Sequence, residues 1–233
     1  MNVVDYVILG VIGVSVLFGL YRGFISSVLN TGGCLIAFLA SFALYPRLTE
    51  YIAGNAELQR TLLTYTDASS RIGDLATSIT RVGNLTAQSI SEVVSKAGLP
   101  EAMSELLRSN LSNQIYGASE TVSDYVSQTV LGASTNILCF IVVFVALYLV
   151  ISLLLSAIRA IFRLPVLKQL DAVVGGGFGF LRGALFVFIL FALLPLVQTI
   201  APMDSISELM ETSVLAPYFN NGALMTAIMN GSM

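Results

Sequence analysis

The sequence predicts an all-α membrane protein with four membrane-spanning helices. Four long apolar stretches contain no charged residue, namely 6–21, 23–46, 125–158 and 183–203. A helix needs about 20 apolar residues to cross a bilayer, and a charge near the bilayer centre costs about 2.5–3.5 kcal/mol. The chain as a whole has 233 residues and is 56% hydrophobic but only 11% charged, whereas soluble domains are about 25% charged.

The boundaries of the helices follow from where the charges and polar residues resume. We expect transmembrane helices at residues 3–21, 24–45, 135–158 and 178–200. They divide the chain into a first hairpin (1–45), an extramembrane segment (46–132), a second hairpin (133–200) and a C-terminal tail (201–233). The N-terminal sequence has no basic segment and no small-residue cleavage site, so the first helix is expected to remain uncleaved.

The segment between the second and third spans differs in composition, because it holds nine of the fourteen acidic residues. Its apolar residues recur at helical spacing: Ile72, Leu75, Ala76, Ile79 and Val82, then Met103, Leu106, Leu107 and Leu111. Pro100 and Glu101 are typical of a helix start. We therefore predict helices and no sheet here. They form either a small bundle, packed on itself or on the membrane domain, or an arm that binds lipid or another protein.

The basic residues predict the orientation in the membrane. Arg22 lies in the first short connection, and Arg159, Arg163 and Lys168 lie in the second, whereas the tail has no Lys or Arg. Basic residues in short loops favour the cytoplasmic side. We expect both termini outside, in a multi-pass protein of the bacterial inner membrane.

Composition also limits the chemistry. The chain has no histidine, a net charge of −3 and two cysteines, Cys34 and Cys139, both inside predicted spans. The lack of histidine removes the commonest general base and metal ligand, and the acidic balance disfavours a nucleic-acid partner. We predict no catalytic residues, no metal and no cofactor, and we interpret the cysteines as packing residues.

Two segments share the pattern F-G-x-x-R-G. The first is Phe18–Gly23, with Gly19, Arg22 and Gly23, and the second is Phe178–Gly183, with Gly179, Arg182 and Gly183. They indicate either an internal repeat or a coincidence of residues common at membrane boundaries. The arginines either anchor helix ends by reaching the headgroups or bind an anion through the guanidinium fork.

Glycines and acids supply the remaining candidates. Gly175, Gly176 and Gly177 lack the Lys-Ser/Thr of a phosphate-binding loop, so a flexible helix start or a close packing surface is the better interpretation. Gly10, Gly13, Gly19, Gly32 and Gly33 also suit close helix contacts. Asp5 and Asp171 lie at predicted membrane edges, where a helix-start or interfacial role competes with proton coupling. Asp171 could also pair with Lys168.

Together these motifs resemble the colicin V production protein (CvpA) family. The resemblance is carried by D-x-h-I-h from Asp5, by G-x-x-R-G-F from Gly19, and by L-(N/D)-x-x-x-G-x-x-x-G-x-x-x-G from Leu170 through Gly175, Gly179 and Gly183. The tail contributes S-x-L-x-P, from Ser213 to Pro217. Residues 50–130 carry no motif to match. The resemblance implies an inner-membrane protein associated with colicin V production and export and with the cell envelope.

Three functions are open at this point. The first is a non-enzymatic membrane factor that contacts the lipid bilayer and other membrane or export proteins, with a second copy of the chain as a further candidate partner. The second is a small oligomeric transporter or channel subunit. The third, an intramembrane enzyme, has little chemistry to use.

Overall fold

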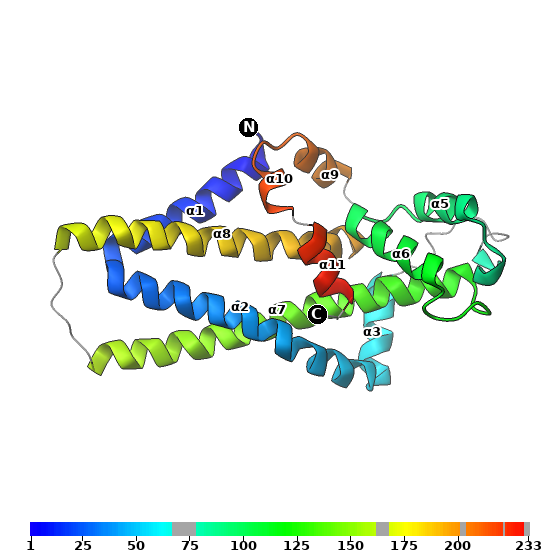
Figure 1. Cartoon of the computed structure of the whole chain (residues 1–233), viewed down its shortest axis with the longest axis horizontal. Coiled ribbons are helices and arrows are strands. Elements are labelled where there is room, and N and C mark those ends of the chain that lie inside the picture. Colours follow the sequence, from blue (N-terminus) through cyan, green and yellow to red (C-terminus); the bar gives the residue numbers. More distant parts are fainter. Residues whose placement is uncertain (67–77, 162–167, 201–203, 221, 231–233) are drawn as a thin grey trace. The chain divides into compact units, whose positions relative to one another are not determined.

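The computed structural model describes residues 1–66, 78–161, 168–200, 204–220 and 222–230. The described residues form helices and turns, with a single antiparallel bridge between Arg81 and Thr121 and no strands (Figure 1). The protein is therefore all-α, as the sequence predicts.

Four helices are long and apolar enough to cross a membrane. They are α1 (Val3–Arg22), α2 (Phe24–Ala53), α7 (Val122–Ile161) and α8 (Lys168–Ile200). The four predicted spans are thus confirmed. The shorter helices are α3 (Ala56–Thr66), η2 (Val82–Asn84), α5 (Ala87–Lys96), α6 (Glu101–Asn113), α9 (Asp204–Glu211), α10 (Ala216–Phe219) and α11 (Gly222–Asn230).

Two of the long helices begin earlier than predicted. α7 begins at Val122 and not near residue 135, and α8 begins at Lys168 and not near residue 178. The extra turns of α7 are polar on one side, so hydropathy missed them. The extra turns of α8 contain three consecutive glycines, which are poor helix formers, and the helix continues through them because Gly175 and Gly176 pack against α1.

By internal contacts the chain forms two compact units. The first unit comprises Met1–Tyr45, Phe140–Ala192 and Asp204–Asn221. The second unit comprises Pro46–Cys139, Leu193–Met203 and Gly222–Met233.

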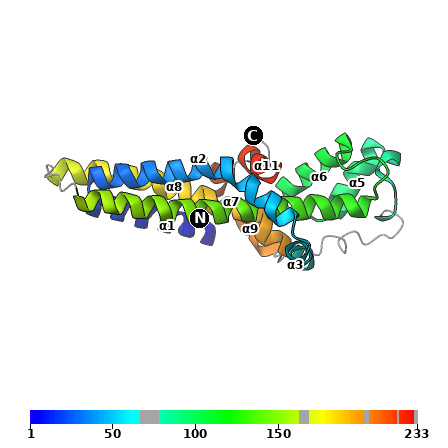
Figure 2. The ribbon, with the colours of Figure 1, turned by 90° about the horizontal axis from the view of Figure 1, so that it is seen from below.

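The second unit has a core of its own. Buried residues of α5, α6 and the start of α7 form it: Val82, Val93, Val94, Ala97, Leu107, Leu111, Val122, Tyr125, Val126 and Val130. Figure 2 shows α5 and α6 lying along the first part of α7. Inside the unit, Asn110 Nδ2 donates to Thr129 Oγ1 at 3.0 Å, so a buried polar pair links α6 to α7.

This core matches the bundle, one of the two interpretations of residues 46–132, and binding of the segment to lipid or another protein stays a prediction. Leu107 and Leu111 of α6 belong to it, and Met103 and Leu106 of the same apolar stripe are also buried. Pro100 stands at the N-cap of α6 and Glu101 in its first turn, as predicted. The helices form a bundle packed on itself. The earlier part of the pattern fails at Ile79, which lies in a turn and is 67% exposed, while 72, 75 and 76 lie outside the described residues.

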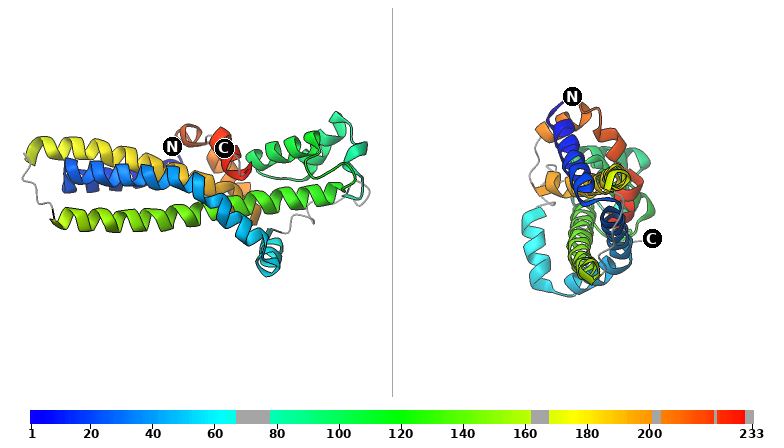
Figure 3. Two further views of the ribbon diagram at one scale, coloured as in Figure 1. Left: turned by 60° about the horizontal axis from the view of Figure 1, so that its bottom comes forward. Right: turned by 90° about the vertical axis from the view of Figure 1, so that its left-hand side faces the viewer.

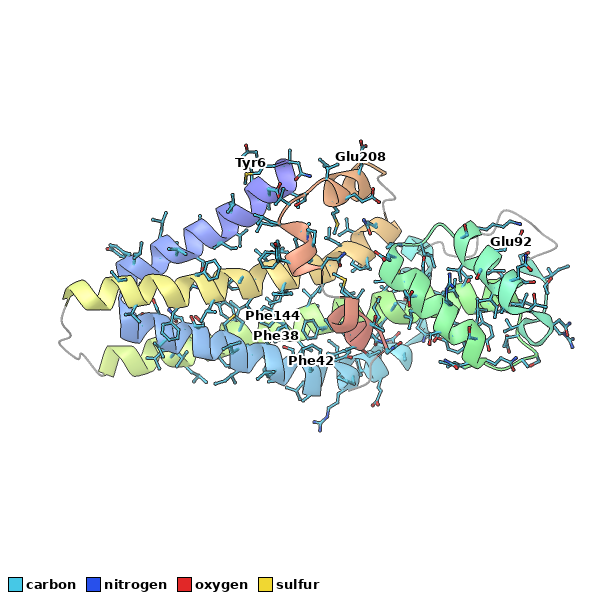
Figure 4. All side chains as sticks on the ribbon, turned by 45° about the horizontal axis from the view of Figure 1, so that its top comes forward. Tyr6, Phe38, Phe42, Glu92, Phe144 and Glu208 are labelled. Carbon is cyan, nitrogen blue, oxygen red and sulfur yellow. The ribbon has the colours of Figure 1, made fainter. Side chains whose placement is uncertain are left out.

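In the first unit, aromatic rings hold three of the long helices together. Phe38 and Phe42 of α2 meet Phe140 of α7, with ring centroids 5.8 and 4.8 Å apart. Phe144 of α7 meets Phe186 of α8 at 6.4 Å. Figure 4 shows Phe38, Phe42 and Phe144 close together between α2 and α7. Cys34 is fully buried in the same core, so its predicted packing role fits, and both cysteines are free.

Candidate functional site

The first site lies at the start of α1, where Asn2 and Asp5 form a capping box. The Asn2 side chain accepts hydrogen bonds from the backbone N–H groups of Val4 and Asp5, at 3.0 and 3.3 Å. Asp5 Oδ2 in turn accepts from the backbone N–H of Asn2 at 2.8 Å. Orphan N–H groups of the first helical turn are thereby satisfied. Of the two interpretations of Asp5, this geometry shows the helix-start role.

The other oxygen of Asp5 binds the C-terminal tail. Oδ1 accepts hydrogen bonds from Ser213 Oγ at 2.6 Å and from the backbone N–H groups of Val214 and Leu215 at 3.1 and 2.9 Å. The Asp5 side chain is fully buried. Hydrogen bonds to a charged acceptor are stronger than neutral ones, which is how a carboxylate is held in such a place. We call this group of residues the tail latch.

Further contacts extend the tail latch. The Asn2 amide donates to Leu209 O and to Thr212 Oγ1. Ser213 Oγ accepts from the backbone N–H of Ala216 at 3.0 Å, at the start of α10, where Pro217 occupies an early helical position. In Figure 3 the N-terminus lies beside the segment that carries α9 and α10. The structure thus brings Asp5, Ser213 and Pro217 together from opposite ends of the sequence.

The second site is a close contact between α1 and α8, built from glycines. A Cβ added at Gly175 would lie 2.5 Å from Gly19 O, and one added at Gly179 would lie 2.5 Å from Ser15 O. A Cβ at Gly183 would lie 2.9 Å from Ile12 Cα. These neighbours are backbone atoms, so they cannot move aside as a flexible side chain would. We call this contact the glycine seam.

The glycine seam confirms one interpretation of the glycines and corrects others. Gly175, Gly176 and Gly177 lie inside α8, so they form neither a phosphate loop nor a flexible helix start. Among the other predicted contact glycines, Gly33 faces side chains of α7, but Gly10, Gly13 and Gly32 face open space. The sequence marks small residues without telling which side of the helix meets a neighbour.

Hydrogen bonds between the long helices line the glycine seam. Ser27 Oγ donates to Gly19 O at 3.3 Å, and Thr31 Oγ1 donates to Phe178 O at 3.0 Å. Gly23 ends α1 with a φ of 81°, a conformation that favours glycine. It separates α1 from α2 by one residue.

Arg182 lies at this seam and is half-buried. Its Nε donates to Ser15 Oγ at 3.1 Å. The candidate span of α8 is Val173–Gln198, so Arg182 stands nine residues into it. α8 begins ten residues earlier than expected, so Arg182 lies in the interior of the helix and not near its start. Anchoring of Arg182 at the headgroups and binding of an anion both stay predictions.

The arginine of the first motif, Arg22, has different surroundings. It is exposed at the end of α1, and its guanidinium carbon lies 5.7 Å from the centre of the Phe18 ring. The two F-G-x-x-R-G segments therefore occupy different environments: one ends a helix, and the other lies in the middle of one. Asp171 belongs to the first turns of α8, but its side chain, like that of Lys168, lies outside the described part of the structure.

Several residues of these sites were missed by the sequence reasoning. Asn2 carries a usable signal, because Asn-x-x-Asp before an apolar run is a capping-box pattern. Ser15, Ser27 and Thr31 carry a weaker one, since hydroxyl groups in membrane helices often bond across helices. In the described ranges, no three His, Cys, Asp or Glu side chains come close enough to hold a metal ion.

Comparison with known proteins identifies the same family that the sequence motifs resemble. The family model described as colicin V production protein matches residues 4–98 and 115–224. It therefore includes much of the region in which the sequence alone showed no motif. No solved structure shows a significant match.

Two curated proteins are similar over part of their length. A colicin V production protein homolog of Haemophilus influenzae is 32% identical over 96 residues, 41% of this chain and 55% of that protein. An uncharacterized transmembrane protein, YshB, of Bacillus subtilis is 27% identical over 101 residues, 43% of this chain and 55% of that protein. The aligned region thus spans about half of each relative. Because the family model covers most of the sequence, the chain belongs to the colicin V production protein family.

Proposed function

We propose that this protein is a non-enzymatic factor of the bacterial inner membrane that supports colicin V production and export, and envelope function, through protein contacts. The observation that carries the proposal is the second unit. Its apolar residues are used in its own core, which leaves the outer faces of α5 and α6 polar. Exposed charged residues on these faces are Glu92, Lys96, Glu101, Glu105 and Arg108.

A polar helical surface of this kind suits a protein partner better than anionic lipid. Its exposed charges include three acids and two bases, and tight adhesion to an anionic bilayer requires a cluster of basic residues. The distribution of Lys and Arg supports an orientation with this surface and both termini outside the cytoplasm. A second copy of the chain is a further candidate partner.

The proposal is tested by complementation. A colicin V-producing strain that lacks its own family member receives the wild type or the double variant Glu101→Lys/Glu105→Lys. We expect the wild type to restore secreted colicin and the variant to restore much less at normal membrane abundance. The control is Glu57→Lys, which reverses an exposed charge on α3. Equal secretion from all three proteins would contradict a contact role for α6.

A transporter or channel subunit is the second candidate, and Arg182 favours it. Arg182 lies within the candidate span Val173–Gln198, and a charge within a span is typical of substrate or ion pathways. Purified protein in proteoliposomes separates the two proposals. Flux of ions or small solutes above that of empty vesicles would support the transporter, and its absence together with rescue of colicin secretion would support the contact factor.

A further inference from the structure

The C-terminal tail contacts a membrane helix within its span. The ring of Phe219, the last residue of α10, lies 5.2 Å from the ring of Phe188 and 6.1 Å from that of Phe191, measured between centroids. Both partners belong to the candidate span Val173–Gln198 of α8 and to the uncharged stretch 183–203. The tail therefore meets a part of α8 that lies inside the span and not beyond its end.

The tail latch fixes the same segment to a second membrane helix. Asp5 lies within the candidate span Val3–Arg22 of α1, and its Oδ1 accepts hydrogen bonds from the backbone N–H groups of Val214 and Leu215. Figure 1 shows α10 between the start of α1 and α8. Two separate sets of contacts thus hold residues 214–219 beside the spans, at the end where α1 begins.

The outward side chains of this segment are apolar. Val214 is 59% exposed and Tyr218 is 76% exposed. Tyr6, in the first turns of α1, is exposed as well (Figure 4). No side chain after Glu211 carries a charge. An uncharged segment with exposed apolar side chains and a tyrosine is typical of the boundary between membrane and water.

We propose that residues 214–219 form an interfacial anchor, in which Val214 and Tyr218 insert into the lipid leaflet that surrounds the start of α1. The contacts of the segment lie within the spans of α1 and α8, where lipid and not water surrounds the helices. Tyrosine suits this place because its ring is apolar while its hydroxyl reaches the headgroups. The anchor is independent of which proposed function holds.

Tryptophan fluorescence tests the anchor directly, because the chain contains no tryptophan. Full-length Tyr218→Trp protein is reconstituted in phosphatidylcholine vesicles whose acyl chains carry bromine near the headgroup end, near the bilayer centre, or not at all. Bromine quenches tryptophan on contact, and an interfacial segment reaches about 5–10 Å into the boundary of headgroups and acyl chains. We expect bromine near the headgroup end to remove most of the fluorescence and bromine near the centre to remove little.

Two reference variants replace apolar side chains of similar exposure, Leu149 at 61% and Ile115 at 59%. Leu149→Trp lies in the uncharged stretch of α7 and should be quenched by brominated lipid. Ile115→Trp lies in the turn after α6, in the second unit, and should keep its fluorescence. The anchor is overturned if Tyr218→Trp keeps as much fluorescence as Ile115→Trp in both brominated lipids, as a side chain facing water or a second copy of the chain would.

A charge at the same position provides a second measurement. Tyr218→Asp should release the segment, because an aspartate is costly in lipid, whereas the same change on a surface that faces water is nearly neutral. Cleavage after Glu211 by a glutamate-specific protease should therefore become faster in vesicles, and the control Tyr218→Phe should leave it unchanged. Equal cleavage of Tyr218→Asp and the wild type would overturn the anchor.

Discussion

The glycine seam makes a quantitative prediction about Gly179. The change Gly179→Ala adds a single methyl group, which would stand 2.5 Å from Ser15 O and 3.0 Å from Val16 Cα. Ordinary van der Waals contact begins near 3.4 Å, so α1 and α8 must separate by several tenths of an ångström along the seam. Overpacking of this kind costs about 1–3 kcal/mol, and the helix propensity gained by replacing glycine returns up to about 1 kcal/mol. We expect a net loss of about 1–2 kcal/mol.

The buried thiol of Cys34 provides the assay. Cys34 is fully buried in the first unit, so a maleimide reaches it only when the unit opens. With Cys139 replaced by alanine, the labelling rate of purified protein in detergent reports the opening equilibrium when closing is faster than labelling. Since 1.4 kcal/mol is a factor of ten, Gly179→Ala should raise the rate by roughly 5- to 30-fold.

Gly13→Ala is the matched control, because a Cβ at Gly13 of α1 meets nothing within 4 Å. It should leave the labelling rate unchanged or lower it, through improved helix propensity. Equal rates for Gly179→Ala and the wild type, or equal acceleration by Gly13→Ala, would refute the assignment of the seam to backbone contact.

Three further predictions concern the tail latch, the second unit and the orientation. Ser213→Ala should speed cleavage after Glu211 by a glutamate-specific protease, and Asp5→Asn should speed it more, because the amide replaces the charged acceptor of three hydrogen bonds; unchanged digestion of Asp5→Asn would contradict the latch. Tyr125→Phe should destabilise the second unit by about 2 kcal/mol, because the hydroxyl donates to Gly117 O and accepts from the backbone N–H of Tyr116. The loss of stability is measured by the maleimide-labelling rate of Cys139 in protein whose Cys34 is replaced by alanine. A labelling rate equal to that of the protein with Tyr125 would contradict the prediction. In intact cells, with both native cysteines replaced, Ser91→Cys and Asn220→Cys should react with a membrane-impermeant maleimide and Leu164→Cys should not, whereas the reverse pattern would overturn the orientation with both termini outside.

Charge exclusion over long apolar stretches was enough to find the spans, because the cost of burying a charge in lipid is large. The starts of α7 and α8 were harder to predict. The first turns of these helices, which begin at Val122 and Lys168, are not apolar enough to be recognised as membrane-spanning. Tertiary packing stabilises these turns, and packing leaves no local trace in the sequence.

The candidate sites show a similar division. Asp5, Ser213 and Pro217 were recognised as separate motifs, but nothing in the sequence indicates that Ser213 binds Asp5 across 208 positions of the chain. The glycine motif predicted close packing correctly at Gly175 and Gly179. The prediction of close helix contacts was wrong for Gly10 and Gly13, because a small residue permits such a contact but does not by itself produce one.

The tail latch also has a consequence for biosynthesis. α1 leaves the ribosome before the tail, yet Oδ1 of its buried carboxylate receives its hydrogen bonds from a segment made 208 residues later. At about 5–20 residues per second, that interval lasts roughly 10–40 s. Throughout it, the first transmembrane helix exposes an unburied acid at its start. An incomplete or truncated chain would keep this acid exposed, and a membrane protease or chaperone that reads such a group could distinguish unfinished chains from finished ones.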